Sequence, residues 1–236
     1  MKIALLGYGR MGKTIEKIAL KRNHTIIYKT SSALEEDQLK QADVAIDFSI
    51  PDAAFTNITT CFKHQIPVIC GTTGWLDKYD EAIKICNENK AAFLYASNFS
   101  LGVNLFFELN TQLAKLMKNF DEYKVDVEEI HHTKKLDKPS GTAITLTDQI
   151  IENSTYTDWK LIEENKQVSE NIIPVEAKRI EDVPGTHLIK YASEIDDIEI
   201  KHTAHSREGF ALGALVAAEF IQDKTGIFSM KDVLNM

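Results

Sequence analysis

A dense group of proton-carrying and anion-binding side chains lies between residues 129 and 143. The segment reads E-I-H-H-T-K-K-L-D-K-P-S-G-T-A, with adjacent histidines at His131 and His132 and lysines at 134, 135 and 138. Imidazole and ammonium groups can each deliver a proton near neutral pH when their surroundings tune them. Cationic side chains also bind carboxylates and phosphates. The pattern therefore predicts that this segment binds a small anion and transfers a proton to it.

The predicted elements around this segment would hold those groups at one site. Residues 125–130 alternate apolar and acidic side chains, which is typical of a half-buried strand. Pro139 disfavours helical geometry at the residue before it, so 134–139 is predicted to be a loop. Ser140 or Thr142 would then cap the helix that follows. The N-terminus of that helix is a further anion-binding group, because its free N–H groups and its dipole favour negative charge.

Other roles for these residues remain open. A histidine on a strand is often only packed or exposed, and the three lysines could form an ordinary solvated charge cluster. A zinc site is not favoured, because lysine is not a usual zinc ligand and no third histidine, cysteine or carboxylate has suitable spacing. Ser140 lies in no G-x-S-x-G motif and is not predicted to be a nucleophile. We therefore predict no metal.

A second candidate site lies near the N-terminus, where residues 7–12 read G-Y-G-R-M-G. This G-x-G-x-x-G pattern follows an apolar strand pattern at 3–6 and precedes a helical pattern at 13–21. The glycines permit a tight turn and the close approach of a pyrophosphate, which the helix N-terminus then binds. A glycine-rich turn without a ligand is the alternative. The context favours a nicotinamide dinucleotide as the cofactor.

The second predicted strand, at 25–29, lacks the acidic residue that usually binds the ribose 2′-hydroxyl of NADH. The sequence instead gives Lys29 followed by Thr30, Ser31 and Ser32. A lysine and hydroxyl groups can bind a 2′-phosphate. We therefore expect the protein to tolerate NADPH, so that the cofactor is NADH, NADPH or both.

The first hundred residues alternate strands and helices. Further strands are predicted at 43–48, 67–70 and 92–95, with helical patterns between them. Five strands alternating with four helical patterns predict a Rossmann-like, doubly wound parallel sheet of the α/β class. Polar residues and glycines follow two of these strands, at 71–74 and 96–100, where such a sheet binds its ligand. An ordinary strand-to-helix turn is the alternative for 71–74.

The remainder of the chain predicts a second domain of the α+β class. A long amphipathic helix at 101–118 leads out of the first domain, and residues 152–170 are predicted to be a polar connection. Three strand patterns follow this connection. Together with 125–130 they would form a mixed or antiparallel sheet, whose open face is the expected oligomer interface.

An alanine-rich helical pattern at 211–220 is expected to return to the first domain. We therefore place a dinucleotide-binding domain at 1–100 and expect C-terminal helices at 208–236 to complete it. The substrate-binding and oligomerisation domain is placed at 101–207.

Length and charge narrow the classes of partner. The chain has 236 residues, of which 44% are hydrophobic and 26% charged, as in an ordinary globular protein. Its net charge of -8 argues against a nucleic-acid or anionic-membrane partner. Cys61, Cys70 and Cys86 have no metal-ligand spacing and are expected to be reduced and buried. With no signal-peptide pattern and no apolar run of about 20 residues, a cytoplasmic location is expected.

The segment at 129–143 resembles a family signature. It is similar to the pattern E-x-H-H-x-x-K-x-D-x-P-S-G-T-A of the 4-hydroxy-tetrahydrodipicolinate reductases, also named dihydrodipicolinate reductases. The family's other motifs occur in the same order, as G-Y-G-R-M-G at 7–12, G-T-T-G at 71–74, S-N-F-S-L-G-V-N at 97–104 and S-R at 206–207. The resemblance therefore spans essentially the whole chain.

The resemblance implies reduction of a cyclic imine dicarboxylate to tetrahydrodipicolinate by NADH or NADPH, in the diaminopimelate route to lysine. It makes His131 the proton donor and acceptor and Lys135 a proton donor. The residues that it assigns to the substrate carboxylates are His132, Gly141 and Thr142, with Lys135 assisting and, on a weaker match, Arg207. Ser140 is added to the expected substrate residues because it opens the helix N-terminus that would bind a carboxylate. Those that it assigns to the cofactor are Gly7, Tyr8, Gly9, Arg10, Met11, Gly12, Gly71, Thr72, Thr73, Ala96, Ser97, Asn98 and Phe99. Lys29 is added to the expected cofactor residues because it could bind a 2′-phosphate. Members of the family are usually homotetramers joined through the sheet of the second domain.

Some positions depart from the family, and other functions remain open. Thr133 and Lys134 stand where the family often has basic or histidine residues, so details of carboxylate binding can differ. An aspartate or homoserine dehydrogenase could share the N-terminal pattern; an enzyme with a cysteine nucleophile would need one at a strand end, and Cys70 is the candidate. A non-catalytic NAD(P)H-binding redox sensor is a third interpretation. Such a sensor would need no proton donors, so the histidines and lysines at 129–143 do not favour this interpretation.

Overall fold

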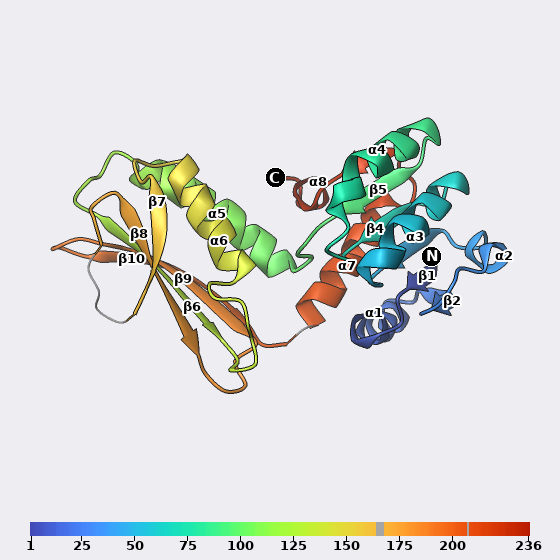
Figure 1. The fold of residues 1–236 in the computed structure, drawn as a ribbon, viewed down its shortest axis with the longest axis horizontal. Helices are drawn as coiled ribbons and strands as arrows, with labels where there is room; N and C mark the ends of the chain where they lie inside the picture. The colour runs from blue at the N-terminus through green and yellow to red at the C-terminus, as the bar shows by residue number, and fades with distance from the viewer. Residues whose placement is uncertain (164–167, 207) are drawn as a thin grey trace. The chain divides into compact units, whose positions relative to one another are not determined.

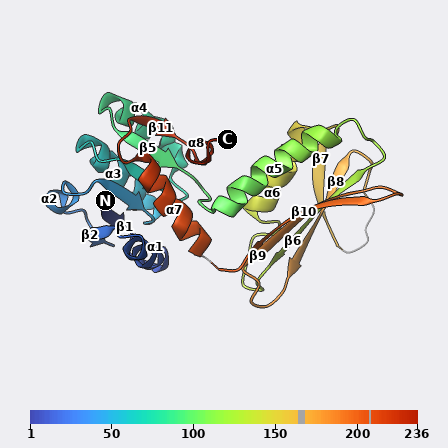
Figure 2. The same cartoon turned by 180° about the vertical axis from the view of Figure 1, so that it is seen from behind.

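The computed structural model describes residues 1–163, 168–206 and 208–236. The chain divides into two compact units, one formed by Met1–Asn104 with Glu208–Met236 and the other by Leu105–Arg207. Figures 1 and 2 show the helices and strands of each unit from opposite sides. Among the described helices, none is long and apolar enough to cross a membrane.

The first unit is built on a six-stranded sheet in which neighbouring strands are parallel. The strands, in their order across the sheet, are β11 (Gly226–Phe228), β5 (Ala92–Tyr95), β4 (Val68–Cys70), β3 (Val44–Asp47), β1 (Lys2–Leu6) and β2 (Thr25–Thr30). Strand β1 pairs with β2 on one side and with β3 on the other, so the chain winds outward from β1 in both directions. This is the predicted doubly wound arrangement, whose ligand site lies where the winding reverses.

Helices cover both faces of this sheet (Figure 1). On one face, α1 (Arg10–Lys21) and α7 (Glu208–Ile221) share a hydrophobic core with the strands. On the other face, α3 (Pro51–Lys63) and α4 (Tyr79–Glu88) bury their apolar sides. The other helices in this unit are α2 (Glu36–Leu39), the 3-10 helix η1 (Leu76–Lys78) and α8 (Met230–Leu234).

The turn between β1 and α1 requires glycine at two positions. Gly7 has a φ of +95°, and a Cβ there would lie 2.1 Å from the carbonyl oxygen of Phe48. A Cβ on Gly12 would lie 2.5 Å from the carbonyl oxygen of Gly7. Both distances are far below van der Waals contact, so a larger residue at Gly7 would push the turn away from the end of β3, and one at Gly12 would distort the turn itself. The glycine pattern therefore has a packing reason in addition to any role in binding.

The second unit contains a five-stranded mixed sheet. In their order across the sheet, the strands are β10 (Asp197–Ala204), β9 (Gly185–Ala192), β6 (Lys124–His131), β8 (Ile172–Arg179) and β7 (Asp158–Ile162). Strand β6 runs parallel to β8 and antiparallel to β9. Helices α5 (Leu101–Met117) and α6 (Gly141–Glu152) share a core with one face of the sheet, where Phe106 and Leu146 pack with Val127 and Val175.

The outer face of this sheet carries ion pairs. Along β6 the buried residues Val125 and Val127 alternate with outward residues, as expected for a strand with one covered face. On the outer face, Lys178 of β8 contacts the carboxylates of Glu128 and Glu176. The described helices of this unit lie on the inner face, so the outer face is the uncovered side that the sequence predicted.

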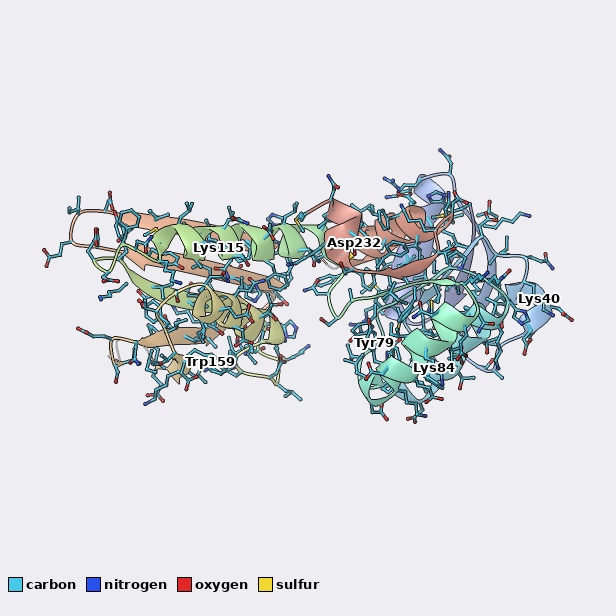
Figure 3. All side chains as sticks on the ribbon, turned by 90° about the horizontal axis from the view of Figure 1, so that it is seen from above. Lys40, Tyr79, Lys84, Lys115, Trp159 and Asp232 are labelled. Atoms are coloured by element: carbon cyan, nitrogen blue, oxygen red, sulfur yellow. The ribbon has the colours of Figure 1, made fainter. Side chains whose placement is uncertain are left out.

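The structure adds three elements to those predicted. Strand β7 lies inside residues 152–170, so the predicted polar connection was wrong for Asp158–Ile162. This strand lies at the sheet edge and leaves most of its side chains exposed, which hides the usual apolar signal. Its Trp159, labelled in Figure 3, packs against the core of the unit. The other additions are α2 and β11. Strand β11 lies between the two predicted C-terminal helices, α7 and α8, and gives the first sheet six strands in place of five.

Candidate active site

The first unit contains a cavity of about 660 Å³ beside the glycine turn. Its walls include Gly7 and Gly9 from that turn, Thr30–Ser32 from the end of β2, and Phe48–Ile50 from the end of β3. Gly9 is the N-cap of α1, and no side chain of the described chain caps this helix end. Its first N–H groups are therefore free to bind an anion. The cavity has the helix terminus and the strand ends that a dinucleotide needs.

Lys29, which the sequence assigns to the cofactor, is held by neighbouring side chains. Its ammonium lies 3.0 Å from Oε1 of Glu16 and 4.5 Å from the centre of the Tyr8 ring. Glu36, from the short helix α2, lines the cavity and lies 2.7 Å from Nε2 of His64. An acidic side chain therefore lines the cavity from an element, α2, that was not predicted from the sequence.

Asp47, at the end of β3, is a buried carboxylate that the sequence analysis missed. It accepts hydrogen bonds from the hydroxyl of Thr72 at 2.5 Å, the hydroxyl of Ser49 at 3.0 Å and the side-chain amide of Asn57 at 2.8 Å. Burial raises the pKa of Asp47, and these hydrogen bonds act in the opposite direction. The network ties together the chain segments that follow β3 and β4.

The predicted cofactor segments 71–73 and 96–99 leave the neighbouring parallel strands β4 and β5 at the same edge of the sheet. Within them, the hydroxyl of Thr72 is turned toward Asp47. Phe99 is buried, with its ring centre 5.7 Å from that of Phe48. The structure therefore gives these two residues a packing role at the sheet edge, beside any contact with a cofactor.

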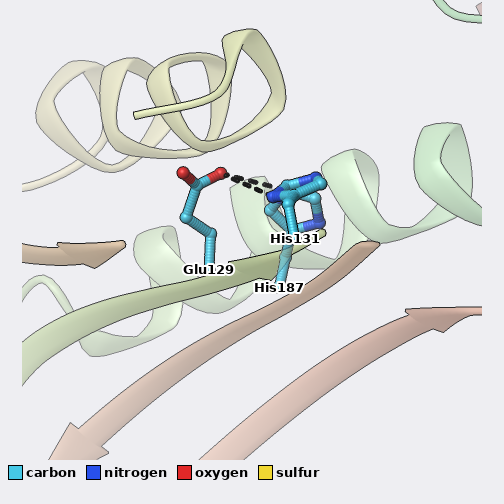
Figure 4. A group of neighbouring side chains, drawn as sticks. All are labelled: Glu129, His131 and His187. Carbon is cyan, nitrogen blue, oxygen red and sulfur yellow. Dashed lines mark ion pairs between the residues drawn. The ribbon is translucent and has the colours of Figure 1, made fainter. Parts of the chain in front are cut away.

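In the second unit, His131 is the last residue of β6 and faces the covered side of the sheet. Its Nδ1 lies 3.2 Å from Oε2 of Glu129, which is completely buried. His187 of β9 stands opposite Glu129 in the antiparallel register, with its ring centre 5.1 Å from that of His131. Figure 4 shows the three side chains meeting above the sheet, with the carboxylate directed at the two rings.

Ser140, one of the two caps that the sequence allows, is the N-cap of α6. Its hydroxyl accepts a hydrogen bond from the N–H of Ala143 and lies 3.2 Å from Nε2 of His187. Its own N–H donates to Oε1 of Glu129 at 3.1 Å. The amides of Gly141 and Thr142 come before the first intrahelical bond and have no acceptor in the described chain. They give α6 a free N-terminus of the kind that can bind an anion.

Lys135 lies in the loop that connects β6 to α6. Its ammonium is 2.8 Å from the carboxylate of Asp137, and this contact holds the pKa of Asp137 below its usual value. Its N–H donates to the carbonyl of His132 at 3.1 Å, which closes a turn directly after the strand. The predicted substrate residue Arg207 lies outside the described residues.

Arg179, at the end of β8, joins this loop to the buried carboxylate. Its Nη2 donates to Oε1 of Glu129 at 3.1 Å and to the carbonyl of Asp137 at 2.6 Å. The sequence analysis missed Arg179 and His187, because only the sheet register brings them beside β6. The alternating pattern of β6 could have identified Glu129, because this acidic residue lies on the same inward face as His131 and the preceding valines.

The charges at this cluster are set by burial and by close contacts. Burial alone raises the pKa of Glu129, but the contacts with His131 and Ser140 outweigh it and bring the pKa to about 2. Burial also lowers the pKa of His187 to about 4, and the neighbouring His131 acts in the same direction. Near neutral pH, the cluster therefore holds an ionised carboxylate and a neutral His187.

Glu129, His131 and His187 also offer a possible metal donor set, because their ligand atoms lie within 4.8 Å of one another. The sequence analysis rejected zinc partly for want of a third ligand, and that reason was wrong, since β9 supplies one. The Arg179 guanidinium, however, contacts the same carboxylate. Its positive charge opposes binding of a divalent cation, so the donor set does not favour a metal.

A family model described as the N-terminus of dihydrodipicolinate reductase matches residues 1–99, and one described as its C-terminus matches residues 102–234. The chain belongs to the dihydrodipicolinate reductase family. Its resemblance to the family in sequence is thereby confirmed.

Relatives in the dihydrodipicolinate reductase family align over the full length. The 4-hydroxy-tetrahydrodipicolinate reductase of Christiangramia forsetii is 61% identical over 238 residues, covering 100% of this chain and 98% of the relative. That of Thermosipho africanus is 34% identical, with 99% and 98% covered. The structure of a dipicolinate-bound dihydrodipicolinate reductase from Paenisporosarcina sp. TG-14 superposes with a TM-score of 0.78 at 20% identity, covering 97% of each chain. This likeness confirms the fold.

Membership of this family removes the need for a cysteine nucleophile. Cys70 is buried, and burial together with the charge of Asp47 raises its pKa well above the usual value, so a thiolate is disfavoured. Cys61 and Cys86 are also free and buried, as the sequence predicts. The dehydrogenase with a cysteine nucleophile is therefore not supported.

Proposed function

We propose that the protein reduces 4-hydroxy-tetrahydrodipicolinate to 2,3,4,5-tetrahydrodipicolinate with NADH or NADPH, in the diaminopimelate route to lysine. The observation that carries this proposal is the full-length alignment, at 61% identity, with a 4-hydroxy-tetrahydrodipicolinate reductase. The glycine turn with its adjoining cavity and the histidine–lysine segment offer the two kinds of chemistry that such a reduction needs.

The reaction exchanges a carbon–oxygen bond for a carbon–hydrogen bond. Substrate, NAD(P)H and one proton give product, NAD(P)⁺ and water. A bound nicotinamide supplies the hydride. Once the 4-hydroxyl has left as water, hydride addition to the conjugated imine leaves an electron pair shared between the ring nitrogen and the carbon next to the imine carbon. A proton must then be added to the ring.

His131 and Lys135 are the proposed sources of that proton. An imidazolium or ammonium near the ring stabilises the developing negative charge and delivers the proton, which typically contributes 10²–10⁴-fold in rate. The ion pair of Lys135 with Asp137 supports a charged ammonium at this position. His131 is supported by its place at the end of β6, beside a carboxylate that is completely buried.

The substrate carries two carboxylates, which need positive partners. We assign them to His132, Ser140, Gly141, Thr142 and Arg207. The amides of Gly141 and Thr142 lie at a helix N-terminus, where free N–H groups and the dipole favour an anion. Ser140 contributes through its position as the cap, because its hydroxyl is engaged with Ala143 and His187.

We assign the cofactor to the glycine turn and the neighbouring strand ends. The residues are Gly7, Tyr8, Gly9, Arg10, Met11, Gly12, Lys29, Gly71, Thr72, Thr73, Ala96, Ser97, Asn98 and Phe99. For cofactor choice, Glu36 in the cavity can accept a hydrogen bond from a ribose hydroxyl and repels a phosphate. Lys29 would attract that phosphate, but Glu16 balances its charge. We propose that both NADH and NADPH are used.

The test is a spectrophotometric assay with freshly made product of dihydrodipicolinate synthase. Purified protein should oxidise NADH and NADPH at 340 nm only when that product is present. Running the same assay with aspartate semialdehyde or homoserine tests the dehydrogenase alternatives. Oxidation with those compounds, and none with the synthase product, would refute the proposed function.

We further propose a cytoplasmic homotetramer joined through the outer face of the second sheet. The ion pairs of Lys178 on that face and the absence of a described helix over it support this assignment. Light scattering should give four times the chain mass of 26.6 kDa. A mass of one chain at micromolar concentration would contradict it.

A further inference from the structure

Glu129 is a buried carboxylate at a position where the fold alone would favour a hydrocarbon. It is 0% exposed and follows Val125 and Val127 on the covered face of β6. Burying a charge costs several kcal/mol unless partners compensate it. Neighbouring N–H groups and imidazole rings compensate the charge at both carboxylate oxygens of Glu129. These groups come from different parts of the proposed substrate site.

The first oxygen, Oε1, holds the loop and the helix. It accepts the N–H of Ser140, which fixes the start of α6 and its free amides. It also accepts Nη2 of Arg179, and the same nitrogen donates to the carbonyl of Asp137 in the loop that carries Lys135. A second guanidinium nitrogen, Nη1, donates to the carbonyl of Lys178 and so anchors the arginine to β8.

The second oxygen, Oε2, faces the imidazoles. It lies 3.2 Å from Nδ1 of His131 and 3.8 Å from Nε2 of His187, and beyond these ion-pair contacts it accepts no hydrogen bond in the described chain. A carboxylate beside one ring nitrogen selects the tautomer with its proton on that nitrogen. Nδ1 of His131 then keeps its proton, and Nε2 is left to exchange one with a ligand.

We propose that Glu129 and Arg179 form a positioning pair, which sets the tautomer and orientation of His131, the loop that carries Lys135, and the amides that open α6. The pair touches neither substrate nor cofactor and acts through these three parts. The roles of His131 and Lys135 in this inference rest on the proposed function. The contacts of Glu129 and Arg179 are observed independently of it.

The main test is Glu129→Gln, which keeps the size of the side chain and removes its charge. The amide group of glutamine would face N–H donors. We therefore expect kcat to fall about 10–100-fold, the loss typical of removing the carboxylate that orients a metal-bound histidine. The dissociation constant for NADH, measured by fluorescence, should stay within about 2-fold of the wild-type value, because the cavity beside the glycine turn belongs to the first unit and Glu129 to the second. Glu152→Gln, at the exposed end of α6, is the matched control and should keep wild-type kcat.

A spectroscopic measurement separates positioning from general damage. Long-range ¹H–¹⁵N spectra of histidine-labelled protein at alkaline pH report which ring nitrogen carries the proton, and His131→Asn assigns the signal. Wild-type protein should show Nδ1 of His131 protonated and Nε2 bare, and Glu129→Gln should show a mixture of the two tautomers. An unchanged kcat, or a reduced kcat with an unchanged ring signature, would overturn the role of Glu129.

Arg179→Lys tests the other half of the pair and serves if Glu129→Gln does not fold. An ammonium can compensate the carboxylate but cannot also reach the loop and β8 in the same fixed geometry. We expect kcat/KM for the substrate to fall about 10-fold while the His131 tautomer stays as in wild type. Wild-type kcat/KM in this variant would remove Arg179 from the proposal. If wild-type protein does not reduce the substrate, the proposed function fails, whereas the ring spectra still test Glu129.

Discussion

The ammonium of Lys135 lies 2.8 Å from the carboxylate of Asp137, two residues further along the same loop. The backbone carbonyl of Asp137 in turn accepts a hydrogen bond from Arg179, which is bound to the buried Glu129. The proposed proton donor is therefore connected through its counter-ion to the interior of the second unit. Its position depends on the sheet as well as on the loop.

Replacing Lys135 by alanine should remove a proton donor. We expect Lys135→Ala to lose about 10²–10⁴-fold in kcat, the range for a missing general acid, with the dissociation constant for NADH unchanged. Steady-state kinetics and fluorescence titration give the two numbers. Lys138→Ala, an exposed lysine of the same loop, is the control and should retain most activity. Normal turnover by Lys135→Ala would show that its assigned role is wrong.

Cofactor choice should respond to the contact between Glu16 and Lys29. Glu16→Gln removes the negative charge 3.0 Å from the Lys29 ammonium, so the lysine becomes available to a 2′-phosphate. We expect kcat/KM for NADPH to rise about 5-fold relative to that for NADH, equivalent to about 1 kcal/mol for an exposed pair. The double variant Glu16→Gln with Lys29→Met should reverse the gain. A ratio that stays constant across these variants would place Lys29 outside the cofactor site.

The sequence predicted most of the fold because its signals are local. Apolar strand patterns, helical spacing and the glycine turn each act over a few residues, and they gave the parallel sheet and its winding. The edge strand Asp158–Ile162 was missed because its exposed side chains dilute the apolar pattern. Strand β11 was missed because Gly226–Phe228 has only three residues.

The candidate site was predictable only in part, because some of its residues are close in the sequence and others are brought together only by the fold. His131, Lys135 and Ser140 lie in one continuous segment, so spacing alone could group them. Arg179 and His187 come from β8 and β9, and their contacts with β6 follow from strand register, which the sequence did not specify. Likewise Glu36 lines the cavity from a four-residue helix that has too few residues to show a helical period.

The depressed pKa of His187 predicts a loss of stability in mild acid. Its pKa is about 4 in the folded protein, chiefly through burial, and about 6.5 when unfolded. Above pH 6.5, neither state binds the proton and the residue does not affect stability. As pH falls from 6.5 towards 4, only the unfolded state takes up the proton, so the free energy of unfolding should drop by about 3 kcal/mol.

Urea unfolding at several pH values between 7.5 and 4.5 tests this expectation. His187→Asn cannot titrate, so its free energy of unfolding should fall less steeply than that of wild type across the window. Glu129 does not interfere, because its folded pKa of about 2 makes its stabilising effect disappear only as pH drops below about 4.5. Parallel curves for the two proteins would mean that His187 is not held neutral by burial.

Gly185 of β9 lies close to the ring of His131 and leaves little room for a side chain. A Cβ on Gly185 would lie 3.0 Å from Nε2 of His131, the nitrogen that we assign to proton exchange. Because that contact is tighter than ordinary packing allows, the alanine methyl must displace the ring by a few tenths of an ångström and cover part of that nitrogen. Displacements of about 1 Å at a reacting group can cost about 10² in rate, so we expect Gly185→Ala to lose about 10-fold in kcat. Gly209→Ala is the matched control, since its Cβ would meet its nearest neighbour, Oγ of Ser100, at an ordinary 3.7 Å. Equal kcat values for the two variants, with thermal unfolding showing both to be folded, would place the exchanging nitrogen of His131 elsewhere.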